Sequence, residues 1–270
     1  MNNLYVIVVM YNENCDKSIS CNALLNIKLP FNVIVVDNST TPNKNNELCQ
    51  VNKWKYVNMN GNMGISKAYN KAVNSITLKD YWVVIMDQDT YISSEYFERL
   101  NELIISKPEV WVKVPIVKDE KHYLSPSLIS GNSVKRIKSV EEIKNHRNIS
   151  AINSGMAIYS KVFEKMNYDE RFFLDYIDHN FIKEYKAKFN GNIDIIDSTL
   201  QQTFSDDMHD NIINDETRFK IYLNDFNLFC GINFSGRFYY MMKVLYRAIK
   251  LSIIYKNFVF VSIVIKQKKL

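Results

Sequence analysis

The chain has 270 residues, of which 47% are hydrophobic and 23% are charged, and it contains only 7 Gly and 5 Pro. This composition is typical of a globular protein with a sizeable core, and it excludes collagen-like and low-complexity proteins. At roughly 100–200 residues per domain, the length predicts one large domain or one and a half. The net charge at pH 7 is only +5.

The positive charge is concentrated at the C-terminal end. Residues 236–270 hold eight basic residues and no acidic residue, which leaves 26 basic and 29 acidic residues in 1–235, a net charge of −3. A protein that reads nucleic acid would carry its basic residues on a face of the body, so we expect no nucleic-acid partner. The distribution favours a soluble enzyme whose tail meets an anionic surface.

The four cysteines (Cys15, Cys21, Cys49 and Cys230) form no CxxC pair, so reduced thiols are expected rather than disulfides or a zinc site. Residues 4–10 are apolar but follow no basic segment and run directly into polar residues, which suits a buried strand better than a signal peptide. No run reaches the ~18–20 apolar residues of a spanning helix. The expected location is the cytoplasm.

Strands and helices alternate in the first 105 residues. Buried strands are expected at 4–10, 32–36, 55–58 and 81–86, and helices at 64–76 and 93–105, with a weaker helical pattern at 15–29. Either Ser93 or Ser94 can cap the helix at 93–105. This order predicts an α/β fold whose mostly parallel central sheet is flanked by crossover helices.

The pattern is less regular after residue 105. Strands are expected at 110–117 and 151–158, a polar and mobile stretch at 127–147, and short strands at 192–196 and 198–203. Between them, a helical pattern runs to Lys188 and ends at Asn190-Gly191, a usual helix stop.

Polar residues follow the predicted strands at the point where each strand ends. Because ligands bind outside the carboxyl ends of the strands in parallel sheets, we expect these side chains to converge on one site. The residues concerned are Tyr11, Asn12, Asp37, Asn38, Asp87 and Asp89.

Asp87 and Asp89 stand two apart after a buried strand. Carboxylates at this spacing can hold Mg²⁺ or Mn²⁺ together with diphosphate oxygens, and the metal offsets charge that develops on a leaving diphosphate. The spacing alone is weak, because an Asp after a strand commonly just caps a turn. Asp37 has the same two interpretations: an Asx-turn, or an acceptor for a nucleobase N–H or a ribose hydroxyl.

Asp175 and Asp178 follow two phenylalanines and could share a helix face at its start. A carboxylate that aromatic rings partly desolvate suits a general base, whereas the alternative is a pair of first-turn acids that the helix dipole favours. The four histidines have no metal-ligand spacing, so each is predicted to be a surface residue. They are His122, His146, His179 and His209.

Six segments together resemble the inverting family-2 glycosyltransferases with a GT-A fold, over residues 3 to about 210. They are VIVVMYNEN (6–14), VIVVDNS (33–39), NMGISKAYNKAV (62–73), VVIMDQDT (83–90), NSGMAIYSK (153–161) and DERFFLDYIDHNF (169–181). The DQDT form and the aromatic-Asp-x-x-Asp segment are most similar to the rhamnosyltransferase-like branch that builds O-antigens and capsules.

The resemblance implies a Rossmann-like GT-A catalytic domain, which we expect over 1–235, with a nucleotide-binding half (about 1–105) and an acceptor half (about 106–235). The charge distribution adds a basic amphipathic tail (236–270) after this domain. It implies a hexosyl transfer from a dTDP- or UDP-linked sugar to a saccharide acceptor, expected to be lipid-linked, in cell-surface polysaccharide synthesis. The alternatives are a sugar nucleotidyltransferase, whose Gly-rich loop is missing from residues 10–16, and a non-catalytic sugar-nucleotide-binding or membrane assembly partner.

The same resemblance implies a role for each site residue. Tyr11 and Asp37, with Asn12 and Asn38, match nucleoside contacts. Asp87 and Asp89 match the diphosphate and Mg²⁺ or Mn²⁺ motif, with Asp89 as the direct metal ligand. Asp178 matches the general base, with Asp175 as the competing assignment.

Two residues depart from the family pattern. Gln202 stands where a metal-binding His is common, which puts the metal requirement in question, because an amide oxygen is a weaker ligand. Glu184 stands where an Arg is usual downstream of the base. We therefore expect Asp89, Asp87 and Gln202 as the metal set.

The tail has the pattern of an amphipathic helix. Its apolar residues share one face, whereas Lys243, Arg247 and Lys250 lie opposite, and mostly apolar residues 258–265 follow. The apolar face comprises Phe238, Met241, Met242, Leu245 and Ile249. Such a helix can lie in an anionic membrane interface, which predicts a peripheral location at the inner face of the cytoplasmic membrane. The alternative is a helix that packs on the sheet or forms a dimer contact.

Overall fold

The structure is a computed structural model that describes residues 3–144, 148–203, 211–231 and 233–267. The strands of its main sheet are β1 (Leu4–Met10), β2 (Asn32–Asp37), β3 (Lys55–Asn58), β4 (Trp82–Asp87), β5 (Thr90–Tyr91), β6 (Val112–Lys118), β7 (Tyr123–Ser125), β11 (Met156–Tyr159) and β12 (Ile193–Gln202). Within the described residues, the order is β3-β2-β1-β4-β11-β6-β12-β5, with β7 paired to β6.

The first four strands are parallel, as predicted, and β11 runs antiparallel between β4 and β6. Met10 is in register with Asp37 across β1 and β2, and Val9 with Asp87 across β1 and β4. The carboxyl ends of β1, β2 and β4 therefore meet at one edge of the sheet, here called the carboxyl edge.

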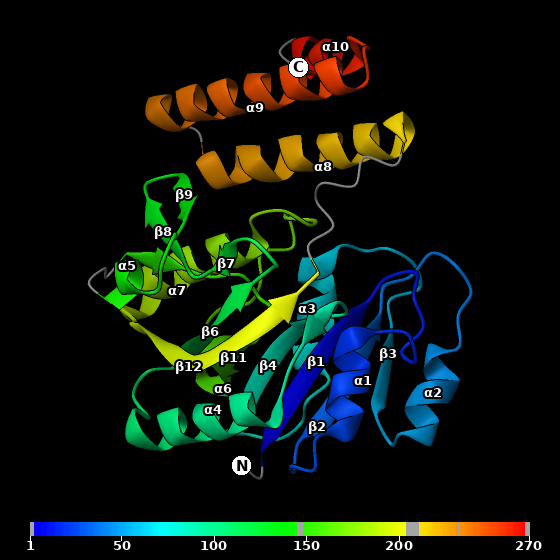
Figure 1. Cartoon of the computed structure of the whole chain (residues 1–270), viewed down its shortest axis with the longest axis vertical. Coiled ribbons are helices and arrows are strands. Elements are labelled where there is room, and N and C mark those ends of the chain that lie inside the picture. The colour runs from blue at the N-terminus through cyan, green and yellow to red at the C-terminus, as the bar shows by residue number, and fades with distance from the viewer. Residues whose placement is uncertain (1–2, 145–147, 204–210, 232, 268–270) are drawn as a thin grey trace.

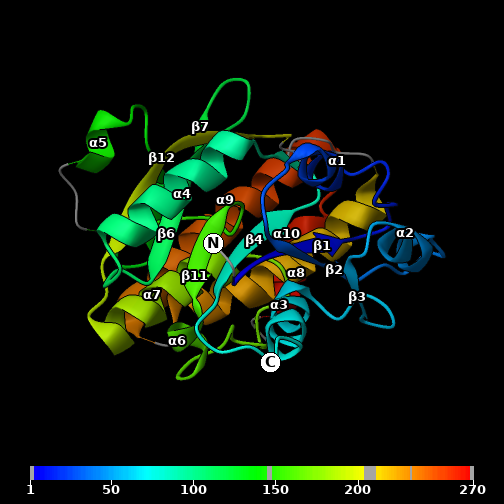
Figure 2. The same ribbon diagram turned by 90° about the horizontal axis from the view of Figure 1, so that it is seen from below.

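Helices cover both faces of the sheet. Figure 2 shows α1 (Ile19–Asn26) and α4 (Ser94–Ser106) on one side, and α3 (Ile65–Asn74), α6 (Ser160–Phe163) and α7 (Ile177–Phe189) on the other. In β1, Val6 and Val8 pack into the core under α1 and α4, whereas Ile7 and Val9 pack into the core under α3. This burial on both sides explains the continuous apolar runs, because no face of the strand meets water.

Residues 45–51 form a further helix, α2 (Asn45–Val51), whose Cys49 is buried in the core under α1. All four cysteines are buried and none forms a disulfide, which confirms the prediction of reduced thiols.

Three helices lie beyond the carboxyl edge. They are α8 (Ile212–Cys230), α9 (Phe234–Ile254) and α10 (Val259–Gln267), here called the helical layer. Figure 1 shows α8 nearest the sheet, α9 above it and α10 beside the end of α9. The sequence pattern indicated α9, but it gave residues 258–265 only as an apolar segment and did not indicate α8. The predicted boundary at 235/236 falls at the start of α9. No helix in the described part of the chain is long and apolar enough to cross a membrane.

The structure corrects several expected elements. Residues 127–144, expected to be irregular, contain β8 (Ser127–Ser130), which pairs with β9 (Ser133–Arg136) on one side and β10 (Ile149–Ser150) on the other in a small antiparallel sheet, and α5 (Glu141–Lys144) follows β9. The expected stretch continues to residue 147, and residues 145–147 lie outside the described part of the chain. The two short strands at 192–203 are one strand, β12, with a register shift between Ile195 and Thr199.

The strand expected at 151–158 begins only at Met156, because Ser154 and Gly155 form a turn. Gly155 has φ +77°, and a Cβ there would lie 2.5 Å from Leu200 Cδ1 and 2.7 Å from Pro115 Cγ. The turn therefore requires a residue without a side chain, both for the backbone conformation and for the space.

We predict that Gly155→Ala lowers the free energy of unfolding by about 2–4 kcal/mol, since it adds overpacking to a left-handed backbone. Gly131→Ala is the matched control, because Gly131 also has a positive φ (+57°) but no atom lies within 4 Å of its Cβ position. Urea unfolding of both variants measures the difference. Equal losses would show that the contacts with Leu200 and Pro115 relax without cost.

Candidate active site

Two carboxylates at the end of β4 share one amide partner. Gln202 Nε2, at the end of β12, donates to Asp87 Oδ2 and to Asp89 Oδ1, at 3.2 Å each. Ser154 donates its hydroxyl to Asp87 Oδ2, and Tyr69 donates to Asp87 Oδ1 at 3.4 Å. Side chains from β4, β12, α3 and the turn before β11 thus meet around Asp87.

The loop that carries Asp89 is fixed from the other side of the sheet by the start of α1. Ser18 Oγ donates to the Gln88 carbonyl at 2.7 Å, and Ser20 Oγ donates to the Thr90 carbonyl at 2.6 Å. Ser18 also caps α1 by accepting from the Cys21 amide. The serines of this helix start therefore orient the two carboxylates.

The pKa values of both carboxyls are raised. Desolvation raises the pKa of Asp89 to about 6, and the nearby charge of Asp87 adds to the effect. Desolvation also raises the pKa of Asp87, and the charge of Asp178 raises it further. The hydrogen bond from Ser154 lowers this pKa but does not cancel the rise. The site concentrates negative charge that its own donors only partly offset.

Asp178 lies at the start of α7, and its charge contributes, after desolvation, to the raised pKa values of Tyr69 and Tyr168 as well as to that of Asp87. Its side chain is about four-fifths buried, and its Oδ1 accepts from the His179 amide at 2.7 Å. The structure therefore brings Asp178 close to Asp87.

Asp175 is placed differently. It precedes α7 rather than sharing its first turn, because Tyr176 between them adopts a left-handed conformation (φ 60°). Both oxygens of Asp175 pair with the guanidinium of Arg218 from α8, with Nη2 and Oδ1 2.8 Å apart. Both carboxylate oxygens of Asp175 therefore already have a charged hydrogen-bond partner.

Asp225 of α8 holds the loop that carries Asp175. Its buried carboxylate accepts from the backbone N–H groups of Phe173, Leu174 and Asp175 at 2.8–3.2 Å. Three consecutive amides that point at one carboxylate form an anion-binding nest. Asp225 and Arg218 of α8 together hold the loop of residues 173–175 in place, so α8 clamps this loop.

The clamped loop also contacts the start of α3 and the aromatic face of α8. The Ile65 amide donates to the Phe173 carbonyl at 2.8 Å, and a Cβ on Gly64 would lie 2.9 Å from the Phe173 ring. The Tyr176 ring stacks on Phe226 and Phe229, at 4.9 and 4.8 Å between centroids. Packing therefore fixes the start of α7, and Asp178 with it.

Asp37 ends β2 and is buried. Its Oδ2 accepts from the Tyr56 hydroxyl at 2.8 Å, and its Oδ1 from the Ser39 amide at 3.1 Å. Burial opposes ionisation, but the hydrogen bonds from Ser39 and Tyr56 outweigh it and hold the pKa of Asp37 below its usual value. Asp37 is thus an ionised acceptor, and its Ser39 bond is the Asx-turn that the sequence left open.

The other three residues at strand ends, Tyr11, Asn12 and Asn38, differ in whether their side chains are exposed to a ligand or occupied by protein contacts. Tyr11 is half-exposed, and its amide donates to Gln88 Oε1 at 2.7 Å. The Asn12 side chain caps the 39–41 turn, with the amides of Thr40 and Thr41 donating to its Oδ1. Asn38 is buried and joins Met10 to the loop before α3. Asn12 and Asn38 therefore shape the site, whereas Tyr11 presents a free ring.

One histidine prediction is wrong. His179 is largely buried, and its Nδ1 lies 2.7 Å from Ser150 Oγ, because the residue after Asp178 faces the small antiparallel sheet. His122 is exposed as predicted. His146 and His209 lie outside the described residues. Glu184 is exposed and accepts from Asn180 on the next turn, so it occupies the surface of α7.

The pattern of the sequence missed the residues that support the carboxylates. They are Tyr56, Tyr69, Ser154, Arg218 and Asp225. Asp225 offered one signal: a single acid among the buried aromatic residues of a helix.

Asp87, Asp89 and Gln202 suit a divalent cation. Two desolvated carboxylates with raised pKa values are the charge that a cation would neutralise, and Mg²⁺ commonly uses one or two carboxylates together with substrate phosphate. The Gln202 side-chain nitrogen faces both carboxylates, so its oxygen could coordinate a cation between them only after the side-chain amide flips by half a turn. Among the described residues, no group of three His, Cys, Asp or Glu side chains could hold a metal.

We predict that Asp89→Asn stabilises the fold by about 1–2 kcal/mol near pH 7 and by nothing below about pH 4. The folded chain holds this proton up to a pKa of about 6 and the unfolded chain releases it near 3.8, so the stability falls as the pH rises through this window. Urea unfolding at both pH values tests the sign, with exposed Asp197→Asn as the control. A gain at both pH values would contradict the charge argument.

We also predict that Asp225→Asn lowers the free energy of unfolding by about 2–3 kcal/mol, because the amides of residues 173–175 lose a charged acceptor. Asp16→Asn, at an exposed position, should change it by less than about 0.5 kcal/mol. Thermal and urea unfolding provide the measurement. A loss no greater than that of the control would show that water replaces the carboxylate.

The sequence and the fold are similar to those of known proteins. Residues 5–167 match the family model described as Glycosyl transferase family 2. The chain is 28% identical over 182 residues to the dTDP-rhamnosyl transferase RfbF of Shigella flexneri, covering 65% of this chain and 60% of that protein.

Two solved structures of S. aureus TarS 1–349, one of them in complex with UDP-GlcNAc, share the fold at 18% identity, with TM-scores of 0.54 and 0.53. They cover 84% of this chain, which spans 64% and 65% of their lengths, so the chain is shorter than these relatives. The mixed sheet flanked by helices is thus the predicted GT-A fold, and the chain belongs to glycosyl transferase family 2.

Proposed function

We propose that this chain is an inverting glycosyltransferase that moves a hexosyl group from a dTDP- or UDP-linked donor to a saccharide acceptor, and that L-rhamnose is the first sugar to test. The main support is that Asp37, Asp87, Asp89 and Asp178 lie around one edge of the sheet. Family membership supports sugar transfer, and the similarity to RfbF supports a rhamnosyl donor.

The donor would lie across the carboxyl edge. Ionised Asp37 would accept from the nucleobase or the ribose, and the exposed ring of Tyr11 would stack on the base. The diphosphate would then lie toward Asp87 and Asp89. Since these groups are all negative, the diphosphate needs a counter-charge at that place.

Asp87 and Asp89 would hold Mg²⁺ or Mn²⁺, with Asp89 as the direct ligand and Gln202 in support. The ion would supply positive charge to the leaving diphosphate, where negative charge grows in the transition state. Asp89 must lose its proton to bind a cation, so metal-supported turnover should fall as the pH drops below about 6.

Asp178 would act as the general base. As the acceptor oxygen forms its bond to the anomeric carbon, the bond from that carbon to the diphosphate breaks, and the hydroxyl proton passes to Asp178. One displacement inverts the anomeric configuration and needs no covalent intermediate. We assign the role to Asp178 rather than Asp175, because Arg218 occupies both oxygens of Asp175.

For the acceptor, we propose a lipid-linked saccharide in the synthesis of a cell-surface polysaccharide such as an O-antigen or a capsule. This choice follows from the rhamnosyltransferase-like relative and from the basic tail, which would hold the enzyme peripherally at the inner face of the cytoplasmic membrane.

The test is a turnover assay that detects released nucleotide, with dTDP-rhamnose and a panel of UDP-hexoses, an acceptor mimic, and Mg²⁺, Mn²⁺ or chelator. We expect release from dTDP-rhamnose, an inverted product by NMR, and a fall in kcat of about 10²–10⁴-fold in Asp178→Asn. Asp169→Asn is the matched control, because Asp169 lies nearby but pairs with the exposed Arg171.

The outcomes separate the alternatives. No release from any donor by folded protein would favour a non-catalytic partner, and formation of a nucleotide sugar from a sugar phosphate would favour a nucleotidyltransferase. Full activity of Asp178→Asn, or a larger loss in Asp175→Asn measured well below its unfolding temperature, would overturn the assignment of the base. Turnover that chelator leaves unchanged would overturn the metal proposal.

A further inference from the structure

The helix α9 has two different faces. One side packs against α8 and α10 through the buried Gly236, Val244, Ala248 and Leu251 and the partly buried rings of Tyr239 and Tyr240. Many other large apolar side chains of the helix are exposed. These are Phe234, Phe238, Met242, Leu245, Tyr246, Ile249, Ile253 and Ile254.

This arrangement is unusual for a packed helix, because the large apolar side chains would normally form the contact with the body. Phe238 and Ile253, nearly the length of the helix apart, are 63% and 71% exposed. We call the row of Phe238, Met242, Leu245, Ile249 and Ile253 the outer row of α9. Its spacing of three or four residues keeps it on one side of the helix, which an isolated exposed residue would not require.

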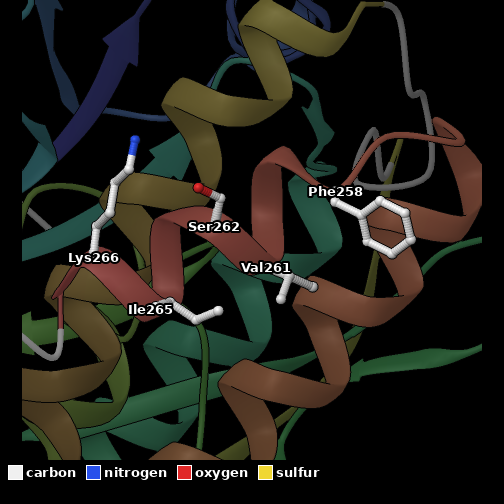
Figure 3. Close-up of a pocket in the computed structure, with 5 residues that line it drawn as sticks. All are labelled: Phe258, Val261, Ser262, Ile265 and Lys266. Atoms are coloured by element: carbon white, nitrogen blue, oxygen red, sulfur yellow. The ribbon is translucent and has the colours of Figure 1, made fainter.

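The segment that forms α10 carries a second apolar surface. A hollow of about 370 Å³ lies along this helix, lined by Phe258, Val261, Ser262, Ile265 and Lys266. Figure 3 shows Val261 and Ile265 to one side of the α10 ribbon, and Ser262 and Lys266 to the other. Phe258, at the start of the segment, is 82% exposed. A groove with apolar walls and a terminal ammonium group suits an acyl chain beside an anionic headgroup.

Basic residues are exposed on the same helix. Lys243 and Lys250, which the sequence pattern placed opposite the apolar face, are exposed as the outer row is, and Lys243 Nζ stands 5.6 Å from the centroid of the Tyr239 ring. Arg247, which the sequence pattern grouped with them, instead packs inward, with its guanidinium 4.2 Å from the centroid of the Tyr222 ring on α8. The exposed side of the helical layer thus carries apolar and cationic groups together.

We propose that the outer row of α9, with the groove of α10, is a docking face for an anionic lipid membrane, which it enters to the depth of one helix face. The charge decides the occupant. A symmetric dimer pairs the same patch of both copies, and the exposed basic residues of each copy would then meet with no acid in 236–270 to neutralise them. These are Arg237, Lys243, Lys250, Lys256 and Lys266. Anionic lipids neutralise this charge and accept the apolar row.

This inference rests on the proposed function, because a lipid-linked acceptor is what would make docking useful. It fixes how the enzyme would stand at the membrane: α9 and α10 lie on the far side of α8 from the sheet (Figure 1). The carboxyl edge would therefore face the lipid across the helical layer, and the acceptor would reach the site from that side.

Sedimentation with vesicles tests the docking face in the full chain. We expect binding to phosphatidylcholine vesicles only when they contain phosphatidylglycerol, with weakening at high salt. Phe238→Ser/Ile253→Ser should lower the partition coefficient at least about tenfold. The matched control is Val51→Ser/Ile105→Ser on the body, because Val51 and Ile105 are 79% and 71% exposed.

A second pair of variants tests the charge. Lys243→Gln/Lys250→Gln should weaken binding about thirtyfold, from about 1 kcal/mol per basic residue, whereas Lys28→Gln/Lys79→Gln on the body should not. Phe238→Trp should show fluorescence that brominated lipid quenches, and Val51→Trp should not. These two results together would establish that the lysines contribute to membrane binding and that the side chain at position 238 enters the lipid.

Three results would overturn the proposal: no difference between the two lipid compositions, unchanged binding of the Phe238/Ile253 variant, or a dimer in sedimentation velocity that the same variant dissociates. Turnover on a short soluble acceptor separates the two hypotheses. If vesicles bind but no donor is turned over, the docking face stands and the proposed function fails. If turnover is normal but vesicles do not bind, the proposed function stands and the docking face fails.

Discussion

The burial of Asp87 and Asp89, together with the repulsion between Asp87 and its neighbours Asp89 and Asp178, is the constraint on which the rest of the site depends. Parallel strands deliver Asp87 and Asp89 to the same edge as Asp37, and α7 adds a further carboxylate. Hydrogen bonds from Ser154, Tyr69 and Gln202 offset this charge only in part, since the pKa values of Asp87 and Asp89 stay raised. This partly uncompensated charge is what the cation of the proposed function would neutralise, and it would supply the counter-charge for a bound diphosphate. The same charge that lowers the stability of the fold therefore defines what the site can bind.

Placement of Asp178 depends on a second, more distant set of contacts. Asp225 and Arg218 of α8 hold residues 173–175, and the aromatic face of α8 holds Tyr176. Arg247 of α9 stacks in turn on Tyr222 of α8, which lies 6.3 Å from the ring of Tyr176. Continuous packing thus leads from α9 through α8 to the residue before α7. Since the outer row of α9 faces away from this path, docking at a membrane would leave these contacts in place.

The sequence predicted what local patterns can determine. Buried strands, the order of strands and helices, and the polar residues at strand ends follow from periodicity and from the rule for parallel sheets, so Asp37, Asp87 and Asp89 were placed correctly at one edge. Asp225 and Arg218 could not be found in this way, because they contact residues more than 40 positions away. The role of Asn12 as a cap for the 39–41 turn was hidden for the same reason. Asp175 and Asp178 looked equivalent until the left-handed Tyr176 separated them.

The tail shows the limit of periodicity most clearly. An apolar stripe predicts an amphipathic helix but not which side faces the protein, and the usual assumption would bury Phe238 and Met242 against the body. In the structure, Gly236, Val244, Ala248 and Leu251 are buried against the neighbouring helices and Tyr239 and Tyr240 contact Phe226, whereas the outer row of α9 is exposed. The outer row therefore lies largely outside the packing of α9 on its neighbours. Residues 236–270 hold no acid, so the anionic lipid surface that we propose would supply both an apolar environment and the opposite charge.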